Sequence, residues 1–190
     1  MNGADVSGTG RLPERLVLVR HGETDWNQER RLQGRTDNPL NGVGRAQARK
    51  AGRLLAADPW HVVVSSPLLR AVQTAQLIAD AVGLQPAGTV PELAERDYGS
   101  AEGLHLNGLT ERQITAALGI GEPEQAVAQR GLAALRDVAV QFPGQRIIAV
   151  AHGTLIRLTL SELTGQHYPR VLNGEVVEVP LAALLAGSAM

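Results

Sequence analysis

The chain has 190 residues, 44% of them hydrophobic, and its 18 basic residues are balanced by 19 acidic ones. This length predicts one domain with a full core, and the balanced charge argues against nucleic acid and against a membrane surface as partners. Cysteine is absent, which excludes disulfides, thiol catalysis and Cys-ligated metals. No apolar run reaches the length of a spanning helix, and the first ten residues do not resemble a signal peptide, so a cytoplasmic protein is expected.

The N-terminal part of the chain predicts a tail, a strand, a loop and a helix. Residues 1–13 are rich in Gly, Ser, Thr and Asp and are expected to form a flexible tail before a single domain at 14–190. The apolar run 16–20 predicts a buried strand. Residues 23–39 carry loop signals, and a helix is expected over 41–57.

The rest of the chain alternates between strands and helices. In chain order we expect a strand at 62–65, a helix capped by Ser66 and running from Pro67 to Val82, a short strand near Thr89, a loop at 91–108, helices at 109–118 and 124–140, a strand at 147–151, a helix at 154–163, a strand at 175–179 and a tail from Leu181 that could fray. This alternation predicts an α/β fold, a three-layer sandwich whose mostly parallel central sheet is flanked by helices and includes one antiparallel strand.

One local pattern occurs twice. The runs Leu16–Thr24 and Ile147–Thr154 each contain an apolar strand, a histidine, a glycine and a polar residue that opens a helix-like segment. Parallel strands deliver the residues that follow them to one edge of the sheet, so His21 and His152 are expected to lie together there. The other histidines, His61, His105 and His167, are expected to be surface or structural residues.

Two arginines are expected at the same edge. Arg20 precedes His21, and Arg70 lies in the first turn after the strand at 62–65. Two guanidinium groups beside two imidazoles and helix N-termini predict a pocket for a dianionic phosphoryl group. The loop at 91–108 supplies carboxylates that could act as a proton donor, and composition does not choose among them: Glu92, Glu95, Asp97 and Glu102.

The run Arg20–Asn27 closely resembles the RHGETxWN motif of the histidine phosphatase superfamily, which includes the cofactor-dependent phosphoglycerate mutases. The resemblance continues in family order through four further blocks and spans roughly 16–165. These blocks are Leu32–Leu40 with Gly44–Ala48, Ser65–Ala75, Leu93–Gly103 and Ala151–Gly153.

The resemblance implies a role for each site residue. His21 is the nucleophile that becomes a phosphohistidine, Glu95 is the acid/base carboxylate, and Arg20, Arg70 and His152 line the phosphate pocket. No metal and no cofactor are implied, and the partner is a small phosphorylated metabolite. The remaining substrate contacts are expected at Asn27, Gln33, Gly34, Tyr98, Gly153 and Thr154.

Hydrolysis is favoured over mutase chemistry, although the block at Glu95 and Tyr98 is mutase-like. Leu106 lies near the place of a mutase lysine, and no arginine pair follows between Glu111 and Glu124. The cap insertion expected at about 104–145 is short, so water can reach the phosphoenzyme. Two other hypotheses are a catalytically idle phosphate-binding module and a two-histidine metal site. The metal site lacks an obvious third ligand. A homodimer is an open expectation.

Overall fold

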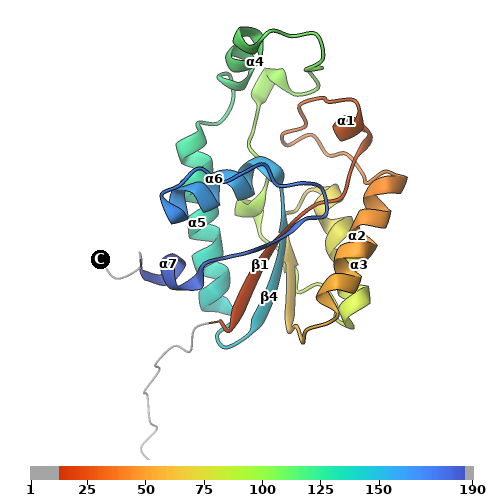
Figure 1. The fold of residues 1–190 in the computed structure, drawn as a ribbon, viewed down its shortest axis with the longest axis vertical. Coiled ribbons are helices and arrows are strands. Elements are labelled where there is room, and N and C mark those ends of the chain that lie inside the picture. The colour runs from red at the N-terminus through yellow and green to blue at the C-terminus, as the bar shows by residue number, and fades with distance from the viewer. Residues whose placement is uncertain (1–12, 187–190) are drawn as a thin grey trace, which may run out of the picture.

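A computed structural model describes residues 13–186 and shows a five-stranded sheet between two layers of helices (Figure 1). The strand order is β3-β2-β4-β1-β5, and β5 pairs antiparallel with β1 whereas the other pairs are parallel. The predicted three-layer α/β sandwich with one antiparallel strand is therefore confirmed. The strands are β1 Arg15–Arg20, β2 Val62–Ser65, β3 Gly88–Thr89, β4 Arg146–Ala151 and β5 Val176–Glu178.

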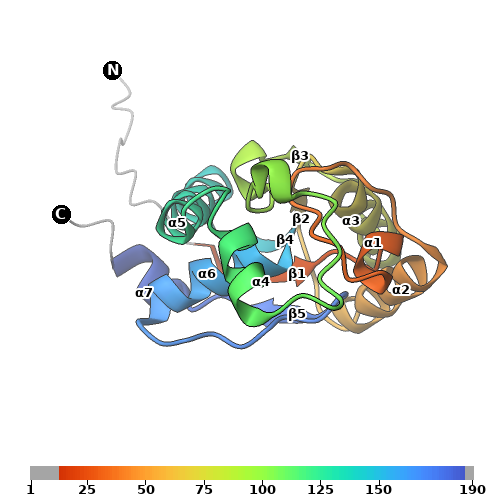
Figure 2. The same cartoon turned by 90° about the horizontal axis from the view of Figure 1, so that it is seen from above.

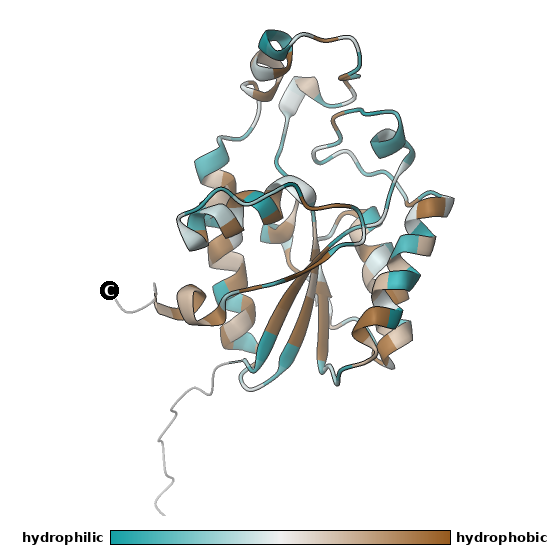
Figure 3. Ribbon diagram, viewed as in Figure 1, coloured by the Kyte–Doolittle hydropathy of each residue, from teal (hydrophilic) through white to brown (hydrophobic). Residues whose placement is uncertain are grey.

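The two layers of helices cover opposite faces of the sheet, whose strands are coloured mostly as hydrophobic in Figure 3. Helices α2 and α3 form one layer, and α5, α6 and α7 form the other. The helices are α1 Asp25–Gln28, α2 Gly42–Leu55, α3 Leu69–Val82, α4 Glu111–Leu118, α5 Glu124–Gln141, α6 Gly153–Thr164 and α7 Leu181–Ala186, with short 3-10 turns at Pro91–Leu93 and Gly99–Ala101. None of the helices in the described part of the chain is long and apolar enough to cross a membrane.

The central strands are buried on both faces, because successive side chains point to opposite sides of the sheet and a layer of helices covers each side. Val17 and Val19 of β1 pack with α2 and α3, whereas Leu16 and Leu18 pack with α5 and α6. All four side chains are at most 2% exposed. This double burial explains why the strands appear in the sequence as continuous apolar runs rather than as an alternating pattern.

Three elements differ from their predicted form. The expected loop at 23–39 contains α1, whose N-terminus is closed by a capping box between Thr24 and Asn27. Helix α3 begins at Leu69 rather than at Pro67, because the backbone of Leu68 is extended, with φ −70° and ψ 135°. The expected loose tail from Leu181 forms α7 up to Ala186, with Leu184 fully buried.

The carboxyl edge of the parallel strands is covered by loops and by two short helices. Helix α4 and the loops around it lie above this edge, and α1 lies above it on the side of α2 (Figures 1 and 2). Helix α5, which falls within the interval 104–145, belongs to the layer against the sheet. The predicted tail at 1–13 lies outside the described residues except for Pro13, which is buried.

Candidate active site

His21 and His152 follow two adjacent strands. β1 and β4 pair in parallel with Arg20 opposite Ala151, so the next residue of each strand is a histidine at the same edge. Their ring centroids are 5.1 Å apart, and the rings are tilted by 56°. Both side chains are buried. The repeated strand–His–Gly pattern therefore does bring the two imidazoles together.

The His21 ring is held in one tautomer by its own backbone. Nδ1 lies 2.6 Å from the carbonyl oxygen of Gly22, and a carbonyl only accepts, so Nδ1 carries the hydrogen and Nε2 keeps a free lone pair. Burial, and then the positive charges of Arg70 and Arg20, hold the pKa of His21 well below 6.5. The ring is therefore neutral near pH 7, which is the nucleophilic form.

The His152 ring presents the opposite nitrogen. Its Nε2 lies 2.7 Å from the Ser66 hydroxyl, which also accepts a 3.3 Å hydrogen bond from the backbone N–H of Leu68. When the Ser66 hydroxyl donates to Nε2, the ring hydrogen is on Nδ1, the buried nitrogen that has no partner among residues 13–186. Burial and the Arg70 charge hold the pKa of His152 well below 6.5.

Backbone carbonyls orient both guanidinium groups. Arg70, which is fully buried, donates from Nη1 to the Thr36 carbonyl at 2.8 Å and from Nη2 to that of Gly34 at 2.7 Å. Arg20 donates from Nη1 to the Val171 carbonyl at 2.7 Å. The Nε–H of each arginine has no partner in the part of the chain that the structure describes, although both atoms are buried.

Within residues 13–186, three buried side-chain nitrogens at this edge of the sheet have no hydrogen-bond partner: Nε of Arg20, Nε of Arg70 and Nδ1 of His152. An unsatisfied buried donor costs about 1–3 kcal/mol, and more when it is charged. A group with several anionic oxygens would satisfy all three. The arrangement has the chemistry of an oxyanion or phosphoryl site with a nucleophilic nitrogen beside it.

The side chain of Glu95 lies against the N-terminus of α6. Its carboxylate accepts hydrogen bonds from the N–H groups of Thr154 at 3.1 Å, Leu155 at 3.0 Å and Arg96 at 2.9 Å. It therefore caps α6, and its side chain is tightly oriented while it lines a cavity together with Arg20. Tyr98 donates to or accepts from the Thr154 hydroxyl at 2.8 Å, and burial raises its pKa to about 12.

The other predicted contact residues are connected to the residues of the site through hydrogen bonds or close backbone packing. The Asn27 side-chain oxygen accepts from Thr24 and from Asn173, which leaves its NH2 group available. The Gln33 oxygen likewise accepts from Thr24 at 2.8 Å. At Gly153, an added Cβ would lie 3.0 Å from Nε of Arg20, so a side chain there would displace the guanidinium group.

Three residues support this site in ways that the sequence analysis did not predict. Ser66, expected to be only a helix cap, fixes the His152 ring. Asn173 donates to the His21 carbonyl at 3.0 Å. Glu102, one of the candidate proton donors, instead accepts from the backbone N–H groups of Arg35 at 2.7 Å and Thr36 at 2.8 Å. Only Ser66 carried a usable signal, because it follows a strand at the edge that holds the histidines.

The remaining histidines lie away from the pocket. His61 accepts from the backbone N–H of Arg146 at 3.0 Å, His105 pairs through its backbone with Arg31, and His167 is exposed. Within residues 13–186, no group of three His, Cys, Asp or Glu side chains is arranged to hold a metal ion.

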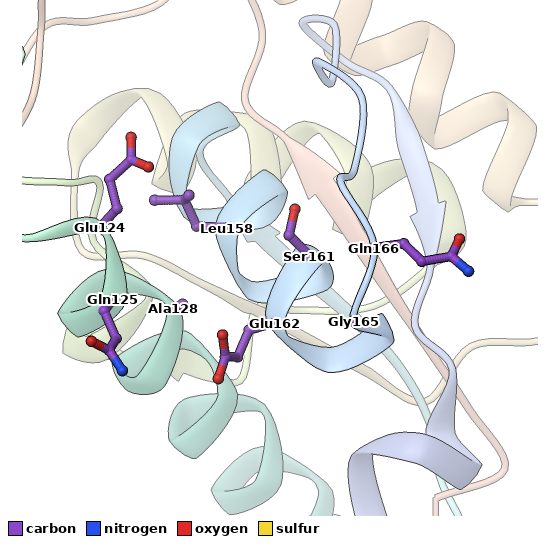
Figure 4. Close-up of a pocket in the computed structure, with 8 residues that line it drawn as sticks. All are labelled: Glu124, Gln125, Ala128, Leu158, Ser161, Glu162, Gly165 and Gln166. Carbon is purple, nitrogen blue, oxygen red and sulfur yellow. The ribbon is translucent and has the colours of Figure 1, made fainter. Parts of the chain in front are cut away.

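Another cavity, larger than the one that Arg20 and Glu95 line, lies between α5 and α6. It has a volume of about 550 Å³, and Figure 4 shows Glu124 and Gln125 on α5 facing it with Ser161 and Glu162 on α6. Two carboxylates and no basic side chain line it. This cavity does not suit a phosphorylated ligand.

Comparisons with known proteins identify the family of the chain. Residues 16–184 match the histidine phosphatase superfamily (branch 1). The chain is 39% identical over 150 residues to an uncharacterized phosphatase, PhoE, of Bacillus subtilis, covering 79% of this chain and 77% of that protein. It is 35% identical over 180 residues to a metal-independent phosphoserine phosphatase of Arabidopsis thaliana, with 87% and 76% covered.

Two further comparisons concern the reaction type and the fold. A probable phosphoglycerate mutase, GpmB, of an Enterobacter strain is 36% identical over 161 residues, covering 79% of this chain and 74% of that protein. Among solved structures, a mycobacterial glucosyl-3-phosphoglycerate phosphatase in complex with VO3 is similar with a TM-score of 0.76 and 28% identity, over 86% of this chain and 91% of that one.

Proposed function

The chain belongs to the histidine phosphatase superfamily, and we propose that it is a metal-independent phosphomonoesterase that hydrolyses a small phosphorylated metabolite through a phosphohistidine on His21. One observation carries the proposal. Buried nitrogens of Arg20, Arg70 and His152 have no partner in the described part of the chain, and they share one edge of the sheet with His21, a neutral histidine whose Nε2 lone pair is free. A phosphoryl group supplies oxygens for the donors and a phosphorus atom for the nitrogen.

The first half-reaction transfers the phosphoryl group to His21. Its Nε2 attacks phosphorus, and the bond from phosphorus to the ester oxygen breaks while the new P–N bond forms. The donors of Arg20, Arg70 and His152 stabilise the charge on the transferring oxygens, where most of the catalysis of phosphoryl transfer lies. Protonated Glu95 gives its proton to the leaving alkoxide, so the alcohol departs.

The second half-reaction hydrolyses the phosphoenzyme. Glu95, now ionised, takes a proton from a water molecule whose oxygen attacks phosphorus, and the P–N bond breaks to release phosphate and neutral His21. The hydrogen bond from Nδ1 of His21 to Gly22 keeps the ring in the same tautomer in both steps. The cycle returns Glu95 to its protonated form.

A phosphoglycerate mutase is the second candidate, because of the mutase-like block at Glu95 and Tyr98 and the similarity to the GpmB relative. A mutase needs further cations beyond the catalytic loop. Leu106, at the expected place of a lysine, is half-buried and packs with an apolar cluster that includes Leu32 and Ala117. Arg112 is exposed on α4 and has no neighbouring arginine in sequence. These features favour hydrolysis.

The proposal is tested with purified protein and radiolabelled phosphomonoesters. Acid-labile, alkali-stable label on His21, release of inorganic phosphate, inhibition by vanadate and activity that survives EDTA are expected together. Binding without turnover would instead identify an idle phosphate-binding module. Loss of activity with EDTA would identify a metal site. Formation of an isomerised phosphoglycerate without release of phosphate would identify a mutase.

A further inference from the structure

The cavity that Arg20 and Glu95 line extends beyond the residues assigned to the phosphoryl group. It has a volume of about 290 Å³. Its other walls come from the start of α6 and from the loop between α6 and β5. The lining residues there are Gly153, Thr154, Arg157, Arg170 and Val171.

The cavity has an excess of positive charge. Three arginines line it, with Glu95 as its one carboxylate, and the oxygens of Glu95 already accept from backbone N–H groups. Arg157 lies 3.6 Å from Glu124 and so is partly neutralised. Arg170 makes no ion pair with any residue between 13 and 186.

The backbone that carries Arg170 is fixed to the end of β1. Nη1 of Arg20 donates to the Val171 carbonyl at 2.7 Å, Asn173 donates to the His21 carbonyl at 3.0 Å, and the N–H of Gly174 donates to the Arg20 carbonyl at 3.0 Å. Arg157 lies in the second turn of α6, the helix that Glu95 caps. Both arginines therefore extend from positions that are set by the phosphoryl pocket itself.

We infer that Arg157 and Arg170 form a subsite for a second anionic group of the substrate, a carboxylate on a short carbon chain beside the transferred phosphoryl group. The planar fork of a guanidinium group matches the two oxygens of a carboxylate. The cavity lies at the small end of the range for ligand pockets, which suits a chain of a few carbons. Glu124 offsets part of the charge, so one negative charge fits better than two. This inference rests on the proposed phosphatase function.

The test compares two phosphomonoesters that differ in one group. 3-Phosphoglycerate carries a carboxylate where glycerol 3-phosphate carries a hydroxymethyl group. The intact protein is expected to have a kcat/KM about tenfold or more higher for 3-phosphoglycerate, as a charge-assisted hydrogen bond provides. Arg170→Ala and Arg157→Ala should each lower the ratio of the two kcat/KM values about five- to tenfold, and Arg170→Glu should lower it further.

Arg112→Ala is the matched control, because it removes an exposed arginine of α4 that does not line the cavity. It should leave the ratio unchanged, whereas Arg170→Lys should restore part of it. An equal loss on both esters in the Arg157 and Arg170 variants, or a wild-type ratio near one, would overturn the subsite.

Failure of the subsite and failure of the phosphatase proposal give different results. Hydrolysis of glycerol 3-phosphate with a ratio near one retains the phosphatase and removes the subsite. If neither ester is hydrolysed, the affinity for 3-phosphoglycerate is measured by calorimetry instead. A loss of affinity in Arg170→Ala but not in Arg112→Ala then supports the subsite, and equal affinity in all three proteins removes it.

Discussion

The ends of β1 and β4 begin from nearly the same local sequence and acquire different chemistry. At the end of β1, the His21 ring bonds to the carbonyl of the next residue, Gly22, and Nε2 is left free. At the end of β4, the His152 ring bonds through Nε2 to Ser66, and Nδ1 is left free. The difference shows that the nitrogen a histidine offers is set by the partner of its other nitrogen.

The environment after each histidine differs as well. A loop follows Gly22, and an added Cβ there would lie 2.2 Å from the Gly44 carbonyl oxygen, so the backbone of α2 closes that side. Helix α6 follows His152, and its N-terminal N–H groups hold Glu95. The first end therefore supplies a nucleophile, and the second supplies a hydrogen-bond donor together with the carboxylate that handles the proton.

The largest expected effect comes from removing the nucleophile. His21→Ala should lower kcat on the order of 10⁴-fold or more, because the covalent path is lost. Rapid quenching with labelled substrate should trap no acid-labile label on the variant. Label that persists would show that the attacking nitrogen belongs to another residue, with His152 the first to examine.

Glu95→Gln should act selectively on poor leaving groups. Without a general acid, hydrolysis of alkyl phosphates should fall roughly 10²–10⁴-fold, whereas p-nitrophenyl phosphate, whose leaving group departs unaided, should be affected much less. Glu92→Gln is the control, because Glu92 is exposed in the same loop. The selective loss is the decisive result, because a variant that only weakens the cap of α6 would lose activity on alkyl phosphates and on p-nitrophenyl phosphate alike. If Glu102→Gln shows the selectivity instead, the proton donor is misassigned.

His152→Ala should distinguish the role of the residue after β4 from that of the nucleophile after β1. Loss of one donor to the transferring group costs about 10²–10³-fold in kcat, but His21 still attacks. The phosphohistidine should therefore remain trappable in this variant and not in His21→Ala. Complete absence of the intermediate in His152→Ala would show that His152 is needed for the attack itself and does not only donate a hydrogen bond.

Ser66→Ala should show a smaller effect through the His152 ring. Loss of one hydrogen bond to the imidazole is expected to lower kcat/KM about tenfold. The ¹⁵N spectrum of the wild-type protein should show His152 with its hydrogen on Nδ1, and the variant should show a mixture of tautomers. An unchanged spectrum would mean that Ser66 does not set the tautomer.

Acid should destabilise the protein through both histidines. The pKa of each is depressed in the folded chain, whereas in the unfolded chain it lies near 6.5. Below that pH the unfolded chain binds more protons, so the free energy of unfolding falls by up to about 1.4 kcal/mol per pH unit for each histidine. Urea unfolding between pH 7.5 and 5.5 should give a shallower dependence for His152→Gln than for the wild type. Equal slopes would contradict the depressed pKa of His152.

The sequence predicted those parts of the molecule whose causes are local. The apolar runs at β1 and β4 require burial on both faces, so their place in a parallel sheet could be predicted, and with it the edge where His21 and His152 lie. The start of α3 was predicted wrongly because Ser66–Pro67 has the local form of a helix cap. Leu68 is instead extended, and the hydroxyl of Ser66 also bonds to His152, far along the chain. No local pattern distinguishes Arg170 from an ordinary surface arginine.

The position of β1 in the sheet constrains how the protein is made. Its two neighbours, β4 and β5, both come from the last quarter of the chain. During synthesis, the buried strand that precedes the nucleophile therefore has no partner strand until β4, which begins at Arg146 whereas β1 ends at Arg20, has been translated. Pairings of such long sequence separation form slowly, because the intervening chain must be ordered first. The nascent protein therefore has no phosphoryl pocket, and the apolar side chains of β1 need protection from aggregation until β4 emerges from the ribosome.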